Sequence, residues 1–288
     1  MAIDKKLAAD CHIHIVADQS EFPLAEHRSY TIPPARVETY WATMSETDVG
    51  RVVVVQPSCY GKDNRCLLDA LESFGDRARG VAVVDPENLD DQLLSDLHDN
   101  GVRGVRVNLL SVRDQARPME TVLPEIDAAL AGSNWHIQVF CAAETLPALA
   151  KLQEKVQAPL VIDHFGFVRP ENLERDFPNL FRLLENGAWV KLSGTDRVAN
   201  GPDSPGLGDL ARKIFAAFPD NAVWGSDWPH TPMHSGGSVS DDVVLPYREI
   251  DTAGFFKGAS EWFPEGSDCH KLFVSNPARL YDWPMDGN

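Results

Sequence analysis

Residues 51–57 read RVVVVQP, with four consecutive valines between an arginine and a polar turn. Valine favours strands, and an unbroken apolar run is typical of a parallel strand that is covered on both faces. Seven further short runs rich in apolar and β-branched residues occur along the chain, at residues 9–15, 80–85, 102–108, 136–141, 159–165, 188–194 and 222–228. The sequence therefore predicts eight buried parallel strands.

Longer amphipathic stretches separate these runs, at residues 34–48, 63–75, 87–98, 119–131, 144–156, 170–186, 206–218, 242–252 and 267–281. Several begin near a proline and stop at a glycine, as helices do. Eight alternations of strand and helix in 288 residues predict an α/β fold, a (β/α)8 TIM barrel, for which about 250 residues are typical. An open doubly wound sheet is the alternative, but the chain lacks the GxGxxG turn expected there.

We expect a single domain over residues 1–288, with no linker or repeat. Residues 229–266 are rich in glycine, proline and serine, so a long loop is expected after the eighth strand. Whether this loop closes over the site as a lid is left open by the sequence.

The charge of the chain limits its partners. Its 43 acidic and 26 basic residues give a net charge of −17, which repels phosphate backbones and argues against nucleic-acid binding. No apolar run approaches the ~20 residues needed to span a bilayer, and residues 1–10 lack the apolar core of a secretory signal. Five cysteines form no CxxC pair, which disfavours a disulfide framework. We therefore expect a cytoplasmic protein without nucleic-acid or membrane partners, and self-association into a homo-oligomer stays open.

Polar residues stand at the predicted C-terminal ends of three strands, where barrels of this type place their active sites. The first strand ends with His12 and His14, whose spacing of two puts both rings on one side. The sixth ends with His164 and the eighth with Asp227. Polar groups at the ends of buried strands each cost a few kcal/mol unless they are paired or used. We therefore predict that these four residues form one site.

This ordered set resembles the amidohydrolase superfamily, and the resemblance extends from residues 10–14 (DCHIH) to residues 275–281 (SNPARLY). Residues 225–230 (GSDWPH) are especially similar to the amidohydrolase 2 branch. Within that branch the chain is most similar to the 2-pyrone-4,6-dicarboxylate lactonases and to related sugar lactonases. The resemblance implies a hydrolase that opens the ring of a carboxylated lactone such as 2-pyrone-4,6-dicarboxylate, in the degradation of aromatic compounds.

The groups themselves indicate a mechanism. Asp227 is expected to act as the general base that takes a proton from the attacking water. His12, His14 and His164 are expected to polarise the lactone carbonyl as hydrogen-bond donors.

The same four residues could instead hold one zinc ion. Members of the superfamily with two metals also use a lysine or an acid at the fourth strand and a histidine at the fifth, where this chain has Arg106 and Phe140-Cys141. A guanidinium disfavours a nearby cation, and the dicarboxylate lactonases are a metal-free branch. We therefore expect no cofactor, with the alternative of a single zinc bound by His12, His14, His164 and Asp227.

Arginines gather on the same predicted face despite the acidic composition. Arg106 lies within the buried run VRGVRVN, where a guanidinium needs an anionic partner. Because arginine binds carboxylates through paired hydrogen bonds, a small anionic lactone is the expected substrate. The resemblance to the lactonases implies that the residues contacting it are Tyr30, Ser58, Arg106, Arg197 and, with an approximate alignment, Arg113.

Three departures from the lactonase pattern leave the particular lactone open. Phe140 stands where a tyrosine is expected, His164 is followed by FGFVR rather than Met-Gly-Arg, and Thr231-Pro232 replaces an asparagine. Two alternative functions remain. One is a zinc-dependent sugar or muconolactone-type lactonase, or a decarboxylase, of the same superfamily. The other is a barrel that binds an acid without turnover.

Overall fold

The computed structural model describes residues 7–26, 28, 30–110, 117–232, 243–263 and 265–285. Within these residues, eight parallel strands follow one another around a single sheet in chain order. The strands are β1 (Ala8–Ile13), β2 (Val49–Val55), β3 (Ala78–Ala82), β4 (Val102–Asn108), β5 (His136–Phe140), β6 (Leu160–Ile162), β7 (Trp189–Ser193) and β8 (Ala222–Gly225). All eight predicted strands are confirmed, with ends that shift by a few residues.

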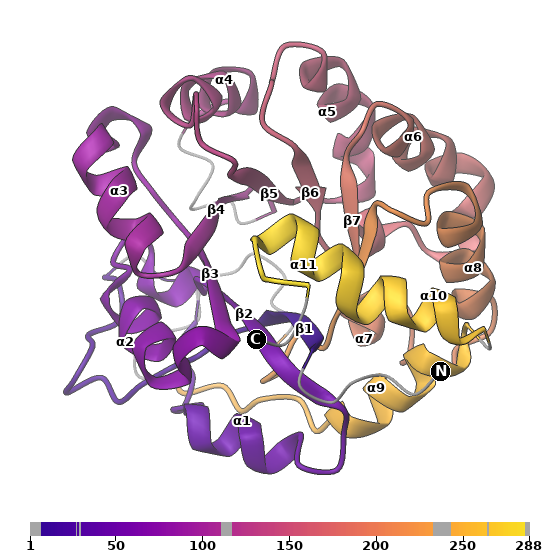
Figure 1. Cartoon of the computed structure of the whole chain (residues 1–288), viewed down its shortest axis with the longest axis horizontal. Coiled ribbons are helices and arrows are strands. Elements are labelled where there is room, and N and C mark those ends of the chain that lie inside the picture. Colours follow the sequence, from indigo (N-terminus) through magenta and orange to yellow (C-terminus); the bar gives the residue numbers. More distant parts are fainter. Residues whose placement is uncertain are drawn as a thin grey trace.

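Helices cover the outside of the sheet (Figure 1). One main helix follows each of the first six strands, namely α1 (Val37–Thr43), α2 (Arg65–Phe74), α3 (Asp91–Asp99), α4 (Met119–Ala129), α5 (Leu146–Gln153) and α6 (Leu173–Glu185). Two more, α7 (Thr195–Val198) and α8 (Leu207–Ala217), follow β7, and α9 (Thr252–Glu261) follows β8. Each longer helix buries one apolar face; α6, for example, buries Phe177, Leu180, Leu183 and Leu184. The predicted (β/α)8 barrel is confirmed.

Backbone hydrogen bonds between the first and last strands close the barrel. The His14 N–H donates to the Trp228 carbonyl over 2.8 Å, and the Asp227 N–H donates to the His12 carbonyl over 2.9 Å. Gly225 makes this approach possible, because a Cβ at its position would lie 2.6 Å from the Cβ of His12. The seam therefore joins the two strands that have three of the four predicted site residues in them or directly after them.

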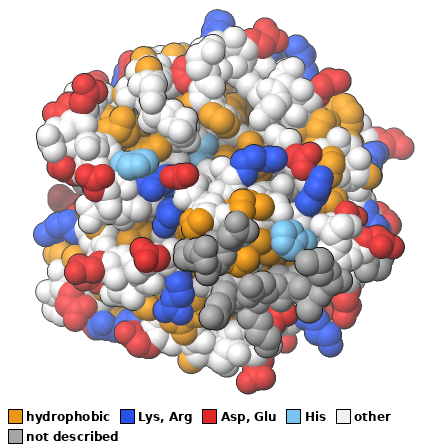
Figure 2. Space-filling model, in the orientation of Figure 1, with side chains coloured by type: hydrophobic (Ala, Val, Ile, Leu, Met, Phe, Trp, Pro, Cys, Tyr) orange, Lys and Arg blue, Asp and Glu red, His pale blue; other side chains and the backbone are white. Residues whose placement is uncertain are grey.

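The C-terminal segment covers the end of the barrel where the strands begin. It consists of α10 (Gly266–His270), a π-helical turn (Lys271–Ser275) and α11 (Asn276–Tyr281), and α11 lies across the barrel in Figure 1. The Tyr281 carbonyl accepts a hydrogen bond from Arg79 in β3, and the Tyr281 ring packs on His136, the first residue of β5. Figure 2 shows acidic and basic side chains interspersed on this face. The C-terminal ends of the strands are therefore the end that is left for a site.

The region after β8 differs from the sequence prediction. Residues 243–251 form no helix, although a helix was expected over 242–252, and α9 lies inside the segment expected to be a loop. The Asp251 side chain accepts a hydrogen bond from the Gly254 N–H, so it caps a helix that begins one residue later. Residues 233–242 and 264 of the expected loop lie outside the described residues. In the part of the chain that is described, no helix combines the length and apolar character needed to cross a bilayer.

Candidate active site

The four predicted residues meet at the C-terminal end of the barrel. The Nε2 atoms of His12, His14 and His164 each lie 3.8 Å from Oδ1 of Asp227. All four side chains are almost completely buried. Among the described residues, Oδ1 of Asp227 has no hydrogen-bond partner. Three ring nitrogens thus surround Oδ1 of Asp227, so the four residues lie together as expected from the sequence.

Unusual backbone conformations place these side chains. The pairing of β1 with β2 is irregular between Asp10 and Ile13, the stretch that contains His12, and such irregularities re-aim side chains. His164 has a φ of 50° and Asp227 a φ of 68°. A non-glycine residue in this left-handed region costs on the order of 1–3 kcal/mol and is concentrated at functional sites.

The groups that face Nδ1 determine where two of the histidines carry their protons. Nδ1 of His14 lies 2.7 Å from the Val55 carbonyl oxygen, which can only accept, so the proton of His14 is on Nδ1. Nδ1 of His12 faces the Asp163 carboxylate at 3.3 Å, which favours the same tautomer. Burial lowers the pKa of His14 to about 4 and that of His12 well below its usual value. Both rings are therefore neutral at pH 7 and present a bare Nε2 that accepts hydrogen bonds, which differs from the donor role expected from the sequence.

His164 has more freedom. Its Nδ1 lies 2.9 Å from the Ser193 hydroxyl, which can donate or accept, so His164 can carry its proton on Nε2 and donate it into the site. Burial lowers its pKa to about 4. Of the three rings, His164 is the one that can polarise a carbonyl while neutral.

A substitution at Gly194 tests whether the position of the His164 ring matters for activity. A Cβ at Gly194 would lie 2.6 Å from Nδ1 of His164, so Gly194→Ala is expected to displace the ring and lower kcat at least tenfold, since small displacements of catalytic groups cost up to about 10²-fold. Gly187 is the matched control, because it also has a positive φ but no atom within 4 Å of such a Cβ. Steady-state kinetics and thermal unfolding of both variants make the comparison. Equal activity of the two variants would contradict the placement.

The charge of Asp227 is set by Arg197. Burial alone would raise the pKa of Asp227, but the Arg197 guanidinium holds it well below its usual value. Nε of Arg197 donates to Oδ2 of Asp227, and its Nη2 donates to the Thr231 hydroxyl over 2.7 Å. Arg197, predicted to contact substrate, thus contacts the candidate base, which is ionised at neutral pH.

Other predicted substrate contacts line one side of the site. Nε of Arg106 lies 3.6 Å from Oδ2 of Asp163, and its guanidinium packs on the Phe140 ring, 4.9 Å from the centroid. The Tyr30 hydroxyl lies 3.3 Å from Oγ of Ser58. Arg113 lies outside the described residues.

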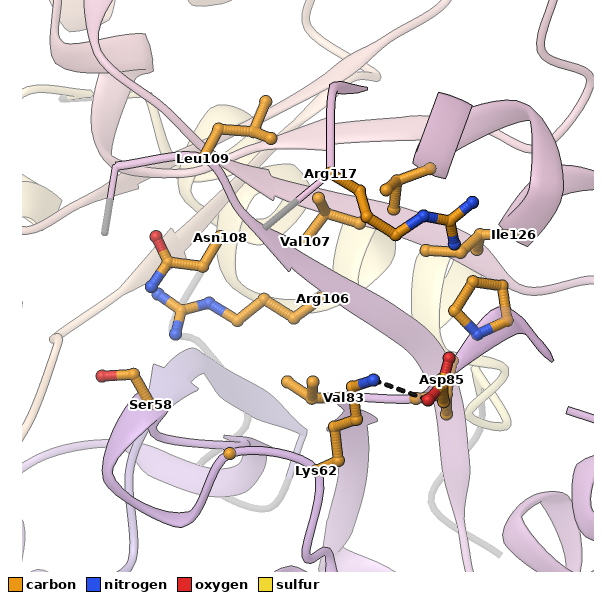
Figure 3. A pocket seen from close by; sticks show the side chains of 14 residues that line it. Ser58, Lys62, Val83, Asp85, Arg106, Val107, Asn108, Leu109, Arg117 and Ile126 are labelled. Atoms are coloured by element: carbon orange, nitrogen blue, oxygen red, sulfur yellow. Dashed lines mark hydrogen bonds and ion pairs between the residues drawn. The ribbon is translucent and has the colours of Figure 1, made fainter. Parts of the chain in front are cut away.

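Arg106 and Ser58 also border a cavity of about 260 Å³. In Figure 3 the Arg106 side chain points toward Ser58 and Asn108, and the Lys62–Asp85 ion pair lies farther along the same cavity. None of the four clustered residues lines this cavity, and Arg106, whose charge helps to lower the pKa of His14, is the residue that relates the two. A cation next to an open volume suits an anionic small molecule.

A buried polar chain supports His12 from below and was missed by the sequence analysis. Nζ of Lys191 donates to Oε1 of Gln138 over 2.6 Å, and Nε2 of Gln138 donates to Oδ2 of Asp163 over 3.1 Å. Asp10, also missed, accepts from the backbone N–H groups of His12 and Ser226. A charged or polar residue inside an apolar strand needs a buried partner, as for Arg106. The same reasoning would have identified Lys191 and Gln138.

The donor set also fits a single zinc ion. His12, His14 and Asp227 offer ligand atoms within 4.8 Å of one another. Metal-binding histidines usually donate their other N–H to a carboxylate or carbonyl. His14 does so to the Val55 carbonyl, and Nδ1 of His12 faces the Asp163 carboxylate at 3.3 Å. The Arg197 contact with Oδ2 leaves Oδ1 of Asp227 available as a ligand.

The comparisons with known proteins agree with this geometry. The family model described as Amidohydrolase matches residues 9–283. A 2-pyrone-4,6-dicarboxylate hydrolase of Comamonas testosteroni is 32% identical over 97% of this chain and 91% of its own length. A 4-sulfomuconolactone hydrolase of Rhizobium radiobacter is 31% identical over 96% of this chain and 90% of its own length.

A solved structure from Pseudomonas putida, named provisionally as a 2-pyrone-4,6-dicarboxylic acid hydrolase, has a TM-score of 0.76 and 25% identity, and it covers 98% of this chain and 99% of its own. The family match and the relatives extend over nearly the whole barrel, including the strands that carry the four-residue cluster. The chain therefore belongs to the amidohydrolase family.

Proposed function

We propose that this protein is a hydrolase that opens the ring of an anionic lactone, of the type that 2-pyrone-4,6-dicarboxylate represents. The observation that carries the proposal is the convergence of Oδ1 of Asp227 with three imidazole nitrogens. Arg106, held beside this cluster next to a cavity, accounts for the negative charge of the substrate. The names of the relatives, both lactone hydrolases, support the same reaction.

The reaction follows from the hydrogen-bonding capacity of each group. A water molecule in the cluster can donate one hydrogen to Oδ1 of Asp227 and the other to the bare Nε2 of His12 or His14. Asp227 takes the proton as the water oxygen bonds to the lactone carbonyl carbon, while His164 donates a hydrogen bond to the carbonyl oxygen. The ring C–O bond then breaks, and the proton passes from Asp227 to the leaving oxygen.

An aromatic wall narrows the substrate class. The rings of Phe140 and Phe167 lie 5.5 Å apart and pack on His164 at 5.4 and 5.9 Å. Phenyl groups offer no hydrogen bonds, so the hydroxyl groups of a sugar lactone would stay unpaired against them at a cost of ~1–3 kcal/mol each. We propose that a flat, unsaturated lactone is preferred to an aldonolactone.

The question of a cofactor separates two candidate mechanisms. We propose hydrolysis without a metal, because Arg197 already compensates the charge of Asp227 and His164 can donate to the carbonyl. The bare Nε2 atoms of His12 and His14 favour the second candidate, a zinc-dependent lactonase or decarboxylase in which His12, His14, His164 and Asp227 hold the ion. When bound, zinc would polarise the carbonyl and lower the pKa of a bound water.

One experiment tests both proposals. The purified protein is assayed with a pyrone dicarboxylate, a muconolactone and an aldonolactone, and zinc content is measured on the same sample before and after chelation. We expect the pyrone to be turned over fastest and chelation to leave its rate unchanged. Loss of turnover on chelation, with recovery on addition of zinc, would support the second candidate. Absence of turnover on every lactone would favour a barrel that only binds acids.

A cytoplasmic location belongs to the same proposal. Its support is that Cys11, Cys59, Cys66, Cys141 and Cys269 are all free and buried thiols, as expected in a reducing compartment.

A further inference from the structure

A second arginine reaches Asp227 from the segment that follows β8. Nη2 of Arg248 lies 3.9 Å from Oδ2 of Asp227, and its Nη1 forms an ion pair with Asp196. Nε of Arg248 donates to the Thr231 carbonyl over 3.1 Å. The side chain is 21% exposed, whereas that of Asp196 is 6% exposed. Arg248 is thus held by three groups beside the candidate base.

Arg197 approaches the same carboxylate oxygen. Its Nε donates to Oδ2 of Asp227, and its Nη2 donates to the Thr231 carbonyl that also binds Arg248. Two guanidinium groups held this close repel each other, and they stay together because Asp196 and Asp227 supply two negative charges between them. Asp196 therefore holds Arg248 in place at the candidate base.

The backbone of Arg248 is anchored as well. Its N–H donates to the His230 carbonyl over 3.0 Å, and the Leu245 N–H donates to the Thr31 carbonyl over 2.8 Å. The Tyr247 hydroxyl donates to the Pro33 carbonyl. The described part of this segment, residues 243–250, therefore connects the end of β8 with the residues around Tyr30, and Arg248 cannot leave Asp227 without breaking several contacts.

We infer that Arg248 is a positioning residue, held by Asp196, which fixes the orientation of the Asp227 carboxylate. Arg197 donates a hydrogen bond to Oδ2 and the Arg248 guanidinium attracts the same oxygen from 3.9 Å, so Oδ1 remains directed at the three imidazole nitrogens. A carboxylate held on one oxygen cannot rotate its other oxygen out of the site, and orientation of this kind contributes strongly to rate. The inference rests on the proposed role of Asp227 as the base.

Kinetics of Arg248→Ala test the inference. We expect kcat to fall at least tenfold, because the base loses its orientation, and KM to change less than about threefold, because substrate contacts are intact. Guanidinium ions added to Arg248→Ala are expected to restore part of kcat, since the partly exposed site gives them access. Arg182→Ala is the matched control, because Arg182 pairs with Glu154 on the exposed surface, and it should behave like the unaltered protein.

Two further variants separate positioning from folding. Arg248→Lys keeps the charge but cannot bind Asp196, Thr231 and Asp227 together, so it is expected to fold normally and to retain reduced kcat. Asp196→Asn should lower kcat in the same direction, and the double variant should lose no more than Arg248→Ala alone, because both act through one ion pair.

Several results would overturn the inference. The first is an unchanged kcat in both Arg248→Ala and Arg248→Lys, and the second is a rise in KM without a fall in kcat in Arg248→Ala. The third is a crystal structure of Arg248→Ala in which the Asp227 carboxylate has not moved. That structure does not depend on turnover. If the unaltered protein opens no lactone, or if Asp227→Asn keeps full activity, the proposed function or base has failed, and the position of Asp227 in the crystal still decides the role of Arg248.

Discussion

Asp227→Asn is expected to lower kcat for the lactone at least about 10²-fold while leaving substrate binding nearly unchanged. The amide has the size of the carboxylate but cannot take a proton from water. The contacts that hold substrate, centred on Arg106 and the aromatic wall, are not altered by the change. Initial rates give kcat, and isothermal titration with a substrate analogue gives the dissociation constant.

The control for this variant is Asp209→Asn on α8, whose side chain is 79% exposed and pairs with Arg212 on the surface. It should show the activity of the unaltered protein. Turnover by Asp227→Asn within a few-fold of that level would move the general base elsewhere and remove the proposed mechanism. Loss of binding together with activity would mean that Asp227 shapes the site rather than acting on water.

Arg106→Met is expected to raise KM at least about tenfold for a dicarboxylated lactone and less than about threefold for a neutral one. A hydrogen bond between charged groups contributes about 1.5–3 kcal/mol. The Arg106 guanidinium adds this to the binding free energy only when the substrate has a carboxylate to accept the bond. Methionine keeps much of the apolar stem of Arg106 and removes only its charged head. The measurement is a pair of KM values on two lactones that differ in one carboxylate.

Arg117→Met is the matched control, because Arg117 borders the same cavity but already pairs with Glu125 at 2.6 Å. We expect little change in KM for either lactone. Since Arg106→Met also removes a partner of Asp163, thermal unfolding of the variant must be compared with that of the unaltered protein. Equal KM changes for the charged and the neutral lactone would remove the argument for a carboxylated substrate.

Much of the barrel could be predicted from the sequence because its strands are short apolar runs buried on both faces. The run RVVVVQP has a simple physical meaning, and the structure places β2 within two residues of it. The strand ends were predicted less accurately where a polar residue follows the strand. β6 stops at Ile162 and β8 at Gly225, because the backbone bends at Asp163 and leaves the regular strand at Ser226, which the apolar pattern does not show.

The site could be predicted only in part. His12, His14, His164 and Asp227 follow from the rule that function lies at the C-terminal ends of barrel strands, and the structure brings them together. Arg248 could not be found this way, because it lies in an irregular segment and its role depends on long-range contacts with Asp196 and Asp227. The tautomers of His12 and His14 were equally inaccessible, since they depend on Asp163, which follows β6, and on Val55 in β2.

The seam between β1 and β8 makes catalytic activity depend on closure of the barrel. His12 and His14 come from the beginning of the chain and Asp227 from a point more than 200 residues later, and they meet only when the Trp228 carbonyl accepts the N–H of His14. A partly folded chain whose last strand has not docked lacks its base, however well its other strands are formed. The rate at which lactone turnover recovers during refolding would therefore report the rate at which β8 docks against β1.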